Sequence, residues 1–513
     1  MTHSTFPVLS TLIFFPLSAS LALLAVKDEV LIRKLTLAAG LLELLFALPL
    51  LGFDLSSGSF QFEEKMAWVP QWGLTFHLGV DGISLLMVLL TVALLPLCVL
   101  CSWNYISKRI KEFHIVLLLM TSACVGVFVA LDFVLFYIFW EAMLVPMYLL
   151  IAVWGGPNKR YASIKFFLYT LAGSTLLLVA IIAFYVAGGT FSIPELMTKQ
   201  FSSELQFWAF LAMALAFAIK CPMFPFHTWL PAAHVEAPTA GSVLLASVLL
   251  KMGTYGFLRF CLPLTPEACI TFAPVMIGLS IAGILYGGVI ALGQKDMKKL
   301  IAYSSVGHMG FVTLGIFLFN QRGVEGAIMQ MLNHGITTGG LFMLVGAVYE
   351  RSHSREIADN MGLGKFLPAY MFFFGLFSLS SLGFPGTNSF VGEALVLVGA
   401  FQHSLIVGAL AIPGAMLAAA YMLRLLQKLA WGEPSTGSKF ADLDRREWLY
   451  LAPLAVFVFY IGLAPTLTLK VMSPSIETLL KDFSAKTSTV ADISKPNLLL
   501  AQHPAPAGKE ARQ

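Results

Sequence analysis

The sequence predicts an all-α polytopic membrane protein with about 14 transmembrane helices. Of its 513 residues, 58% are hydrophobic and only 12% are charged, whereas soluble domains carry about 25% charged residues. Apolar stretches of about 20 residues, long enough to cross about 30 Å of hydrocarbon, recur along the whole chain. These observations exclude an ordinary soluble enzyme. The small net charge of +4 arises in short loops, so nucleic acid is not an expected partner.

Fourteen apolar spans can be placed on the chain. The first is expected to be a retained helix, because no small-residue cleavage site ends it and further spans follow. The twelfth continues beyond residue 384 to residue 403. The predicted spans are residues 6–26, 34–53, 82–103, 113–131, 133–154, 164–187, 206–225, 243–262, 271–292, 300–319, 324–348, 367–384, 406–428 and 448–469.

The distribution of basic residues tests this count and gives an orientation. With the N-terminus outside, the inside loops hold 20 lysines and arginines, and the outside loops before the C-terminal tail hold five. Cytoplasmic loops of membrane proteins carry such an excess. A missed helix would scramble the asymmetry, so the pattern favours fourteen spans.

Two spans are interrupted. The seventh reaches Lys220 and then meets Pro222 and Pro225, which lack the N–H that a helix requires. The segment that follows, FHTWLPAAHVEAPTAG, is too polar to face lipid, so we expect it to fold back inside the bundle. The twelfth span breaks at the sequence GFPG, residues 383–386.

The two breaks lie five helices apart, which suggests two related units. Five is an odd number of helices, so the second unit would be inserted inverted, and sites of transporters built from inverted repeats commonly lie at such discontinuities. We therefore predict a three-helix segment (1–112), two inverted five-helix repeats (113–262 and 271–428), a last helix with its preceding loop (429–470) and a polar tail (471–513). The tail is expected to be disordered or to lie against a partner after a short amphipathic turn.

Four ionisable residues lie within apolar stretches: Glu141, Lys220, Lys251 and Glu393. An ionised group at mid-membrane costs roughly 2.5–3.5 kcal/mol by insertion scales. At 1.5 Å per residue, Glu141, Lys220 and Lys251 share one depth. Lysine can release its proton in a buried site whereas arginine stays charged, so these residue types fit a lateral proton path. The alternative is a Glu141–Lys220 ion pair that only locks helices together.

Histidines and other polar residues extend this pattern. His308 and His334 lie inside spans ten and eleven, where each is either a proton carrier or a hydrogen-bonding core residue. His227 and His234 flank the seventh-helix break, with capping as the alternative to a relay role. Asp81 is expected to cap the third span through its side-chain oxygen.

The sequence shows no cofactor or metal site. The six cysteines include one C-x-x-C pair, Cys98 and Cys101, without a second pair nearby, so we interpret them as packing residues. No nucleotide-binding glycine loop or haem pattern is present. The driving energy is therefore expected from an ion gradient or a partner.

Several segments resemble the antiporter-like membrane subunits of respiratory NADH–quinone oxidoreductase (complex I). The resemblance covers nearly the whole chain, and its most specific part is the run from Ala216 to Phe260. It is carried by FWEAMLVPMYLLIAVWG, AFAIKCPMFPFHTWLPAAHVEAPTAGSVLLASVLLKMGTYGFLRF, KKLIAYSSVGHMGF and GFPGTNSFVGEALVLVGAF.

The resemblance implies roles residue by residue. Glu141 would be the fifth-helix acid, Lys220 the lysine paired with it, Lys251 the eighth-helix lysine and Glu393 the twelfth-helix acid. His308 and His334 would lie on a central hydrophilic axis. Glutamate at position 393, where sister subunits usually carry lysine, and the lack of a long C-terminal arm indicate the branch called subunit M, counterpart of mitochondrial subunit 4.

The resemblance also implies surroundings. FMN, iron–sulfur clusters, NADH and quinone would be bound by other subunits and no cofactor by this chain. Its partners would be the other membrane subunits, including the sister antiporter-like subunits, the lipid bilayer, protons and water, in a bacterial inner membrane. A subunit of a multi-subunit Na⁺/H⁺ antiporter or of a membrane-bound hydrogenase, and a passive scaffold, are the alternatives.

Overall fold

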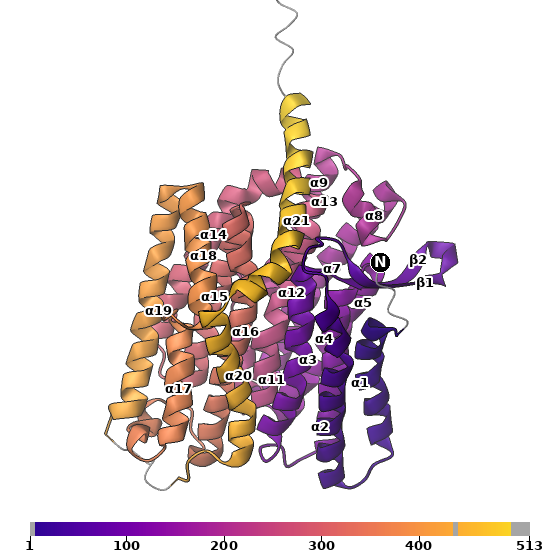
Figure 1. Ribbon diagram of the computed structural model, residues 1–513. Helices are drawn as coiled ribbons and strands as arrows, with labels where there is room; N and C mark the ends of the chain where they lie inside the picture. Colours follow the sequence, from indigo (N-terminus) through magenta and orange to yellow (C-terminus); the bar gives the residue numbers. More distant parts are fainter. Residues whose placement is uncertain (1–5, 434–439, 494–513) are drawn as a thin grey trace, which may run out of the picture.

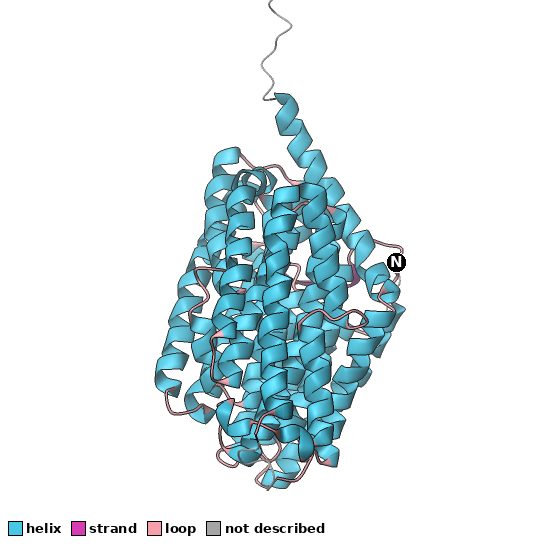
Figure 2. Cartoon of the chain, turned by 90° about the vertical axis from the view of Figure 1, so that its left-hand side faces the viewer, coloured by secondary structure: helices cyan, strands magenta, loops and turns pink. Residues whose placement is uncertain are grey.

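The computed structural model describes residues 6–433 and 440–493, which form a bundle of helices running mostly along one direction (Figures 1 and 2). Twelve helices are long and apolar enough to cross a membrane, and one bent pair, Ala358–Lys365 with Pro368–Ser381, raises this to 13. The helix Val8–Leu24 is apolar but shorter. Each of the fourteen predicted spans thus corresponds to a helix or a broken helix, and the all-α membrane fold is confirmed. The inverted relation of the two five-helix units stays a prediction.

The elements follow the predicted order. The α-helices are α1 (Val8–Leu24), α2 (Glu29–Phe46), α3 (Gly82–Ser102), α4 (Ile110–Val129), α5 (Phe133–Ala142), α6 (Leu144–Trp154), α7 (Lys159–Gly188), α8 (Ile193–Thr198), α9 (Ser203–Lys220), α10 (Trp229–Glu236), α11 (Thr239–Leu244), α12 (Leu250–Gly256), α13 (Leu262–Leu264), α14 (Pro266–Leu292), α15 (Met297–Phe317), α16 (Gln321–Ser352), α17 (Pro368–Ser381), α18 (Asn388–His403), α19 (Leu405–Trp431), α20 (Arg445–Leu463) and α21 (Thr466–Ile493). Two π-helical segments, η3 (Leu245–Leu249) and η4 (Phe257–Cys261), interrupt the eighth span. Short 3₁₀ segments are η1 (Leu48–Gly52), η2 (Pro70–Trp72), η5 (Ala358–Asn360) and η6 (Leu363–Lys365).

The seventh span is broken as predicted. Helix α9 ends at Lys220, and the chain resumes as the short buried helix α10 inside the bundle. Two backbone carbonyls at the end of α9 find new hydrogen-bond donors. The carbonyl of Ala218 accepts a hydrogen bond from the N–H of Met223, and that of Ile219 accepts one from the indole N–H of Trp229. Buried backbone groups need such partners where no water is present.

The twelfth span is also broken, between α17 and α18. Gly383 and Gly386 have φ of +74° and +90°, a region that residues with a side chain rarely adopt. A Cβ at position 383 would also lie 3.2 Å from a carboxylate oxygen of Glu393. Glycine at this turn therefore both permits the break and leaves room for the acid of α18.

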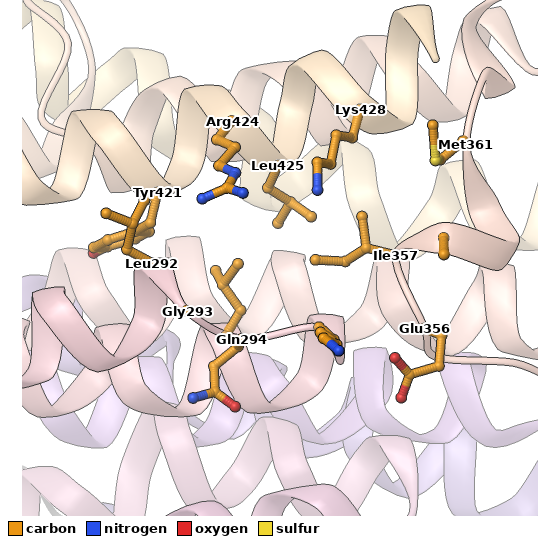
Figure 3. Close-up of a pocket in the computed structure, with 13 residues that line it drawn as sticks. Leu292, Gly293, Gln294, Glu356, Ile357, Met361, Tyr421, Arg424, Leu425 and Lys428 are labelled. Atoms are coloured by element: carbon orange, nitrogen blue, oxygen red, sulfur yellow. The ribbon is translucent and has the colours of Figure 1, made fainter. Parts of the chain in front are cut away.

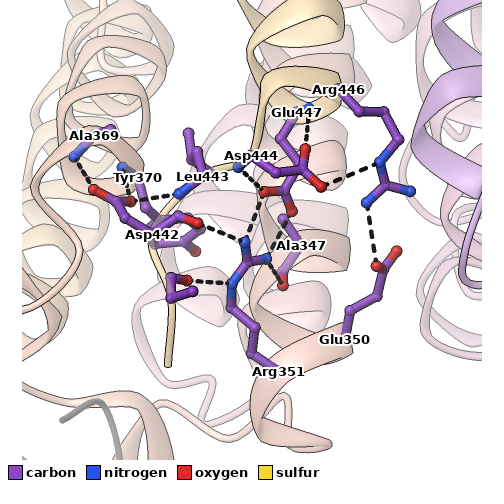
Figure 4. Close-up of polar contacts among 11 residues, drawn as sticks. Ala347, Glu350, Arg351, Ala369, Tyr370, Asp442, Leu443, Asp444, Arg446 and Glu447 are labelled. Atoms are coloured by element: carbon purple, nitrogen blue, oxygen red, sulfur yellow. Dashed lines mark hydrogen bonds and ion pairs between the residues drawn. The ribbon is translucent and has the colours of Figure 1, made fainter. Parts of the chain in front are cut away.

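At the predicted inner end, an ion-pair cluster ties three helices together (Figure 4). Arg351 of α16 donates hydrogen bonds of 2.7 and 2.6 Å to the two oxygens of Glu447 on α20. Asp442 accepts hydrogen bonds from the N–H groups of Ala369 and Tyr370 in the first turn of α17. The cluster fixes where α17 starts relative to α16 and α20.

Two segments differ from the sequence prediction. The loop between the second and third spans contains an antiparallel hairpin of β1 (Gln61–Val69) and β2 (Leu74–Val80), which was not predicted. The tail from residue 471 was expected to be disordered or to lie against a partner after a short amphipathic turn. Its first part is helical instead of disordered, because α21 continues to Ile493 and extends beyond the bundle in Figure 1, and contact with a partner stays a prediction. Lys486 anchors this helix by donating to the carbonyls of Met197 and Pro263 at 2.6 and 2.7 Å. Residues 494–513 lie outside the described chain.

Candidate functional site

Lys251 lies fully buried in α12, in the middle of the eighth span. Its ammonium nitrogen Nζ lies 2.6 Å from Nδ1 of His334 on α16. It also donates a 2.5 Å hydrogen bond to the carbonyl oxygen of Ala246, five residues earlier in the same span. A buried amine therefore has one backbone acceptor and one histidine partner, which satisfies part of its hydrogen-bonding capacity.

The π-helical segment η3 explains how the chain supplies that carbonyl. In a π-helix the N–H bonds to the carbonyl five residues earlier, so the widened turn contains one extra residue. The N–H of Leu250 follows this pattern by bonding to Leu245, and Ala246 lies in the same widened turn. Such turns are frequent at functional sites, and hydropathy alone does not detect them.

His334 connects Lys251 to a second histidine. The rings of His334 and of His308 on α15 lie 5.6 Å apart between centroids. Nε2 of His334 is buried and has no hydrogen-bond partner among the described residues. A single water between the rings would satisfy this nitrogen, since no described residue donates to it or accepts from it.

His308 in turn contacts Glu393 of α18. Nδ1 of His308 lies 2.7 Å from Oε1 of the glutamate, and both side chains are about 5% exposed. The same oxygen accepts a 2.9 Å hydrogen bond from the side-chain amide of Gln330. On its other side, Nε2 of His308 lies 3.3 Å from the hydroxyl of Ser381 and 3.5 Å from that of Tyr421. We call Lys251, His334, His308 and Glu393 the central line.

Glu141 and Lys220 are arranged differently. Among the described residues, Glu141 forms no ion pair within 4.0 Å, so the direct Glu141–Lys220 contact implied by the resemblance is absent from this structure. Lys220 is 2% exposed, and its Nζ lies 4.9 Å from the ring centroid of Trp140 and 3.4 Å from the sulfur of Met143. Glu141 is only half-buried, and its Oε1 has no described hydrogen-bond partner.

The two lysine-bearing helices approach closely through a glycine. A Cβ at Gly253 would lie 2.6 Å from the carbonyl oxygen of Phe217 and 2.7 Å from the backbone nitrogen of Cys221. Gly253 follows Lys251 by two residues, and Cys221 follows Lys220. The backbones beside the two lysines are therefore in contact, although no direct bond joins the two amines.

The structure adds residues that the sequence analysis did not assign to the site. Gln330 holds the carboxylate of Glu393, and only its place on the polar face of α16 could have indicated this. Arg259 is buried in η4 and pairs with Asp81 at 2.6 Å, although the sequence analysis counted it among the five outside-loop lysines and arginines. Asp81 also caps α3 as predicted. His234 is fully buried and stacks on Phe342 at 4.5 Å. Neither of its ring nitrogens has a hydrogen-bond partner among the described residues, so its side chain caps no helix here.

Comparison with known proteins identifies relatives over almost the full length. The family described as NADH:quinone oxidoreductase/Mrp antiporter, TM matches residues 130–418. The chain is 45% identical to NADH-quinone oxidoreductase subunit M of Rhodobacter capsulatus, over 96% of this chain and 99% of that protein. It is 43% identical to NADH-ubiquinone oxidoreductase chain 4 of Arabidopsis thaliana, over 92% of this chain and 97% of that protein.

Solved structures of related membrane complexes contain chains with the same fold. A chain of respiratory complex I from Thermus thermophilus with bound NADH matches with a TM-score of 0.86 and 32% identity, covering 93% of this chain and 99% of that one. A chain of the Mrp complex from Dietzia sp. matches with a TM-score of 0.81 at 21% identity, covering 96% of this chain and 57% of that one, and shares the fold.

Proposed function

Because this chain belongs to the family of antiporter-like membrane subunits of NADH–quinone oxidoreductase, we propose that it moves protons along the central line while redox chemistry takes place on other subunits. As a multi-pass subunit it partners the other subunits of that respiratory complex. The proposal extends from the family to the particular residues that carry the proton. Two observations support it: the similarity of the chain to subunit M relatives, and the burial of the central line.

The observation that carries the proposal is the continuity of the central line. Two contacts of 2.6 and 2.7 Å join Lys251 to His334 and His308 to Glu393. The two histidine rings lie between them, 5.6 Å apart. Four titratable side chains from four different helices therefore meet in the interior, where an ionised group without a partner is costly.

The residue types suit stepwise transfer. A lysine that loses its proton to a neighbouring imidazole becomes a neutral amine, which a dry site tolerates better than an ammonium. Histidine can accept a proton on one nitrogen and release one from the other, so it can pass charge along without turning. Glu393 ends the line as the acceptor, and Gln330 and His308 hold its carboxylate in place.

Glu141 and Lys220 act before the central line in this scheme. A change in the Glu141–Lys220 separation, driven from neighbouring subunits, alters the charge on Lys220 and sends its proton through water to Lys251. The proton then passes His334 and His308 and leaves from Glu393. Moving one charge across 100 mV costs about 2.3 kcal/mol, which a change in one close ion contact can supply.

We also propose that this chain holds no redox centre of its own. Among the described residues no three His, Cys, Asp or Glu side chains cluster as metal ligands, and the six cysteines are unpaired and buried. FMN, iron–sulfur clusters, NADH and quinone would be held by partner subunits. The excess of basic residues in the predicted inside loops supports an orientation with the N-terminus outside, and the bacterial relatives support an inner-membrane location.

The test is Lys220→Ala in the assembled enzyme, reconstituted in vesicles, with proton uptake measured per NADH oxidised. A lower proton-to-electron ratio with intact assembly is expected. Lys34→Ala, an exposed lysine of α2, is the matched control and should leave the ratio unchanged. An unaltered ratio in Lys220→Ala would exclude Lys220 as a carrier. Unaltered pumping in both Lys220→Ala and Glu141→Ala would instead favour a passive scaffold.

A further inference from the structure

A cavity of about 410 Å³ opens at the predicted inner end of the bundle, and none of the four central-line residues lines it. Figure 3 shows the side chains around this cavity. It lies between the last two turns of α19, the end of α14 and the segment that contains η5. Ligand sites commonly measure roughly 300–1,000 Å³, so the cavity has the size of a small-molecule site.

The walls of this cavity carry an excess of positive charge. Lys295, Arg424 and Lys428 line it, against a single acid, Glu356. Figure 3 shows Arg424 and Lys428 pointing from α19 into the cavity. None of these three cations forms a hydrogen bond or ion pair through its side chain with another described residue. We call the cavity lined by Lys295, Glu356, Arg424 and Lys428 the basic pocket.

Three cations around one cavity, with a single acid among them, attract an anion. Arginine and lysine side chains bring several N–H donors, and an arginine fork matches two oxygens of a phosphate group. Gln294, which also lines the pocket, adds a neutral amide that can bind a further oxygen. The chemistry of the walls therefore suits a phosphate group.

Apolar residues surround the charged ones. Leu292, Met361 and Leu425 line the same pocket. Leu423 and Met416, on another face of α19, are 48% and 67% exposed, so this helix also presents an apolar surface outside the pocket. Trp431, 77% exposed at the end of α19, is typical of the membrane–water interface. An occupant with a phosphate head and apolar chains would fit both surfaces.

We propose that the basic pocket binds the phosphate group of an anionic phospholipid, with the acyl chains lying along α19. Basic pockets between transmembrane helices on the cytoplasmic side are known to recognise anionic headgroups. Free inorganic phosphate shares the headgroup chemistry but would leave the apolar walls uncovered. Lysines and arginines near a helix end also extend toward the membrane interface without forming a site. Here, however, Arg424 and Lys428 point into one cavity, which Lys295, just after the end of α14, also lines.

The occupant would lie close to the second half of the relay. Tyr421 lines the pocket, and its hydroxyl oxygen lies 3.5 Å from Nε2 of His308. A phosphate bound beside Tyr421 would be one side chain away from the His308–Glu393 contact. Lipid composition would then act on proton transfer through a charge that the protein itself does not supply.

The test uses the assembled enzyme in detergent, depleted of lipid and incubated with a phosphatidylglycerol that carries a diazirine close to its headgroup. After irradiation, labelled peptides are mapped by mass spectrometry. Labelling within residues 421–431 is expected. Unlabelled phosphatidylglycerol should displace the label, and phosphatidylcholine should do so about ten-fold less well, since it lacks the net negative charge that the cations recognise.

Variants separate the pocket from the general membrane surface. Arg424→Gln combined with Lys428→Gln should reduce labelling about ten-fold, whereas the matched pair Lys34→Gln with Arg445→Gln, exposed elsewhere at the same end, should not. Glu356→Gln removes the single acid and should increase labelling about two-fold, which keeps the test valid if the double variant fails to assemble. Equal labelling of the double variant, or equal competition by phosphatidylcholine, overturns the proposal. Displacement by millimolar inorganic phosphate as effective as by lipid overturns the lipid occupant.

Discussion

The two buried lysines of this chain have opposite surroundings. Lys251 touches a titratable partner at 2.6 Å, and its neighbours continue to Glu393 with one gap between two histidine rings. Lys220 lies instead against an indole ring and a thioether, and Glu141 lies beyond ion-pair distance. The two lysines look alike in the sequence, but only Lys251 has a titratable side chain within hydrogen-bond distance of its amine.

This contrast separates two tasks. The central line has the short contacts that transfer needs, so it can conduct whenever a proton is supplied. The Glu141–Lys220 region has no direct contact and an incompletely buried acid, so its geometry must change before it can supply one. A gate and a conductor are therefore distinguishable by mutation.

Lys251→Met should have the largest effect. Methionine keeps the length and apolar stem but removes the only amine in contact with Nδ1 of His334 among the described residues. Pumping per NADH should fall about ten-fold or more through this subunit's path, since a positioned proton carrier contributes at least that much. Dye quenching in reconstituted vesicles measures it. If Lys251→Met pumps normally, the central line is not the route.

Glu393→Gln should lower pumping somewhat less. Glutamine can still accept the hydrogen bond from Gln330 but cannot carry a proton, so packing is retained while transfer stops at His308. Glu393→Asp is the matched control, because it keeps the carboxylate on a shorter stem and should recover part of the activity. Equal loss in both variants would indicate a purely geometric role.

Gly253→Leu tests whether contact between the lysine-bearing helices matters. The added atoms would meet the backbone of α9 at 2.6 Å, and overpacking of this kind costs about 1–3 kcal/mol. A lower melting temperature of the subunit is expected, together with reduced pumping. Gly278→Leu is the control, since nothing lies within 4 Å of a Cβ there. Similar melting temperatures for the two variants would show that α9 and α12 need not approach so closely.

Trp140→Leu should have the smallest effect. The ring contacts the ammonium of Lys220 by a cation–π interaction, worth about 2 kcal/mol or more when buried. Its loss should change pumping about two- to three-fold, and Trp140→Phe should change it less because an aromatic face remains. A loss as large as that of Lys251→Met would mean that Lys220 depends on Trp140 far more than the geometry indicates.

The sequence reveals the site residues but not their pairing. Glu141, Lys220, Lys251 and Glu393 stand out because a charge within an apolar run is costly. Their depth follows from helix length, but which neighbour each one faces depends on how the helices are rotated around their axes. No pattern in the chain indicates that His334 faces Lys251 or that Glu141 and Lys220 lie apart.

The fold shows the same limit. Span positions and both breaks follow from hydropathy, proline and glycine, and the structure has them where predicted. The β1–β2 hairpin was missed although QFEEKMAWV and TFHLGV flank a glycine turn, because short strands give a weak signal next to long apolar runs. Helix α21 was missed because Pro474 and many small polar residues obscure its helical period, whereas contacts such as those of Lys486 stabilise it.

The widened turns of the eighth span have a consequence for its rotation. Each π segment adds one residue to a helical turn, and one residue corresponds to a rotation of about 100° around the helix axis. An evenly wound helix through η3 would therefore aim the Lys251 amine about a quarter of a circle away from the imidazole of His334. Deleting a single residue from η3 would shorten the span by only about 1.5 Å, a mismatch that the bilayer tolerates at little cost. The same deletion would nevertheless break the contact between the Lys251 amine and Nδ1 of His334.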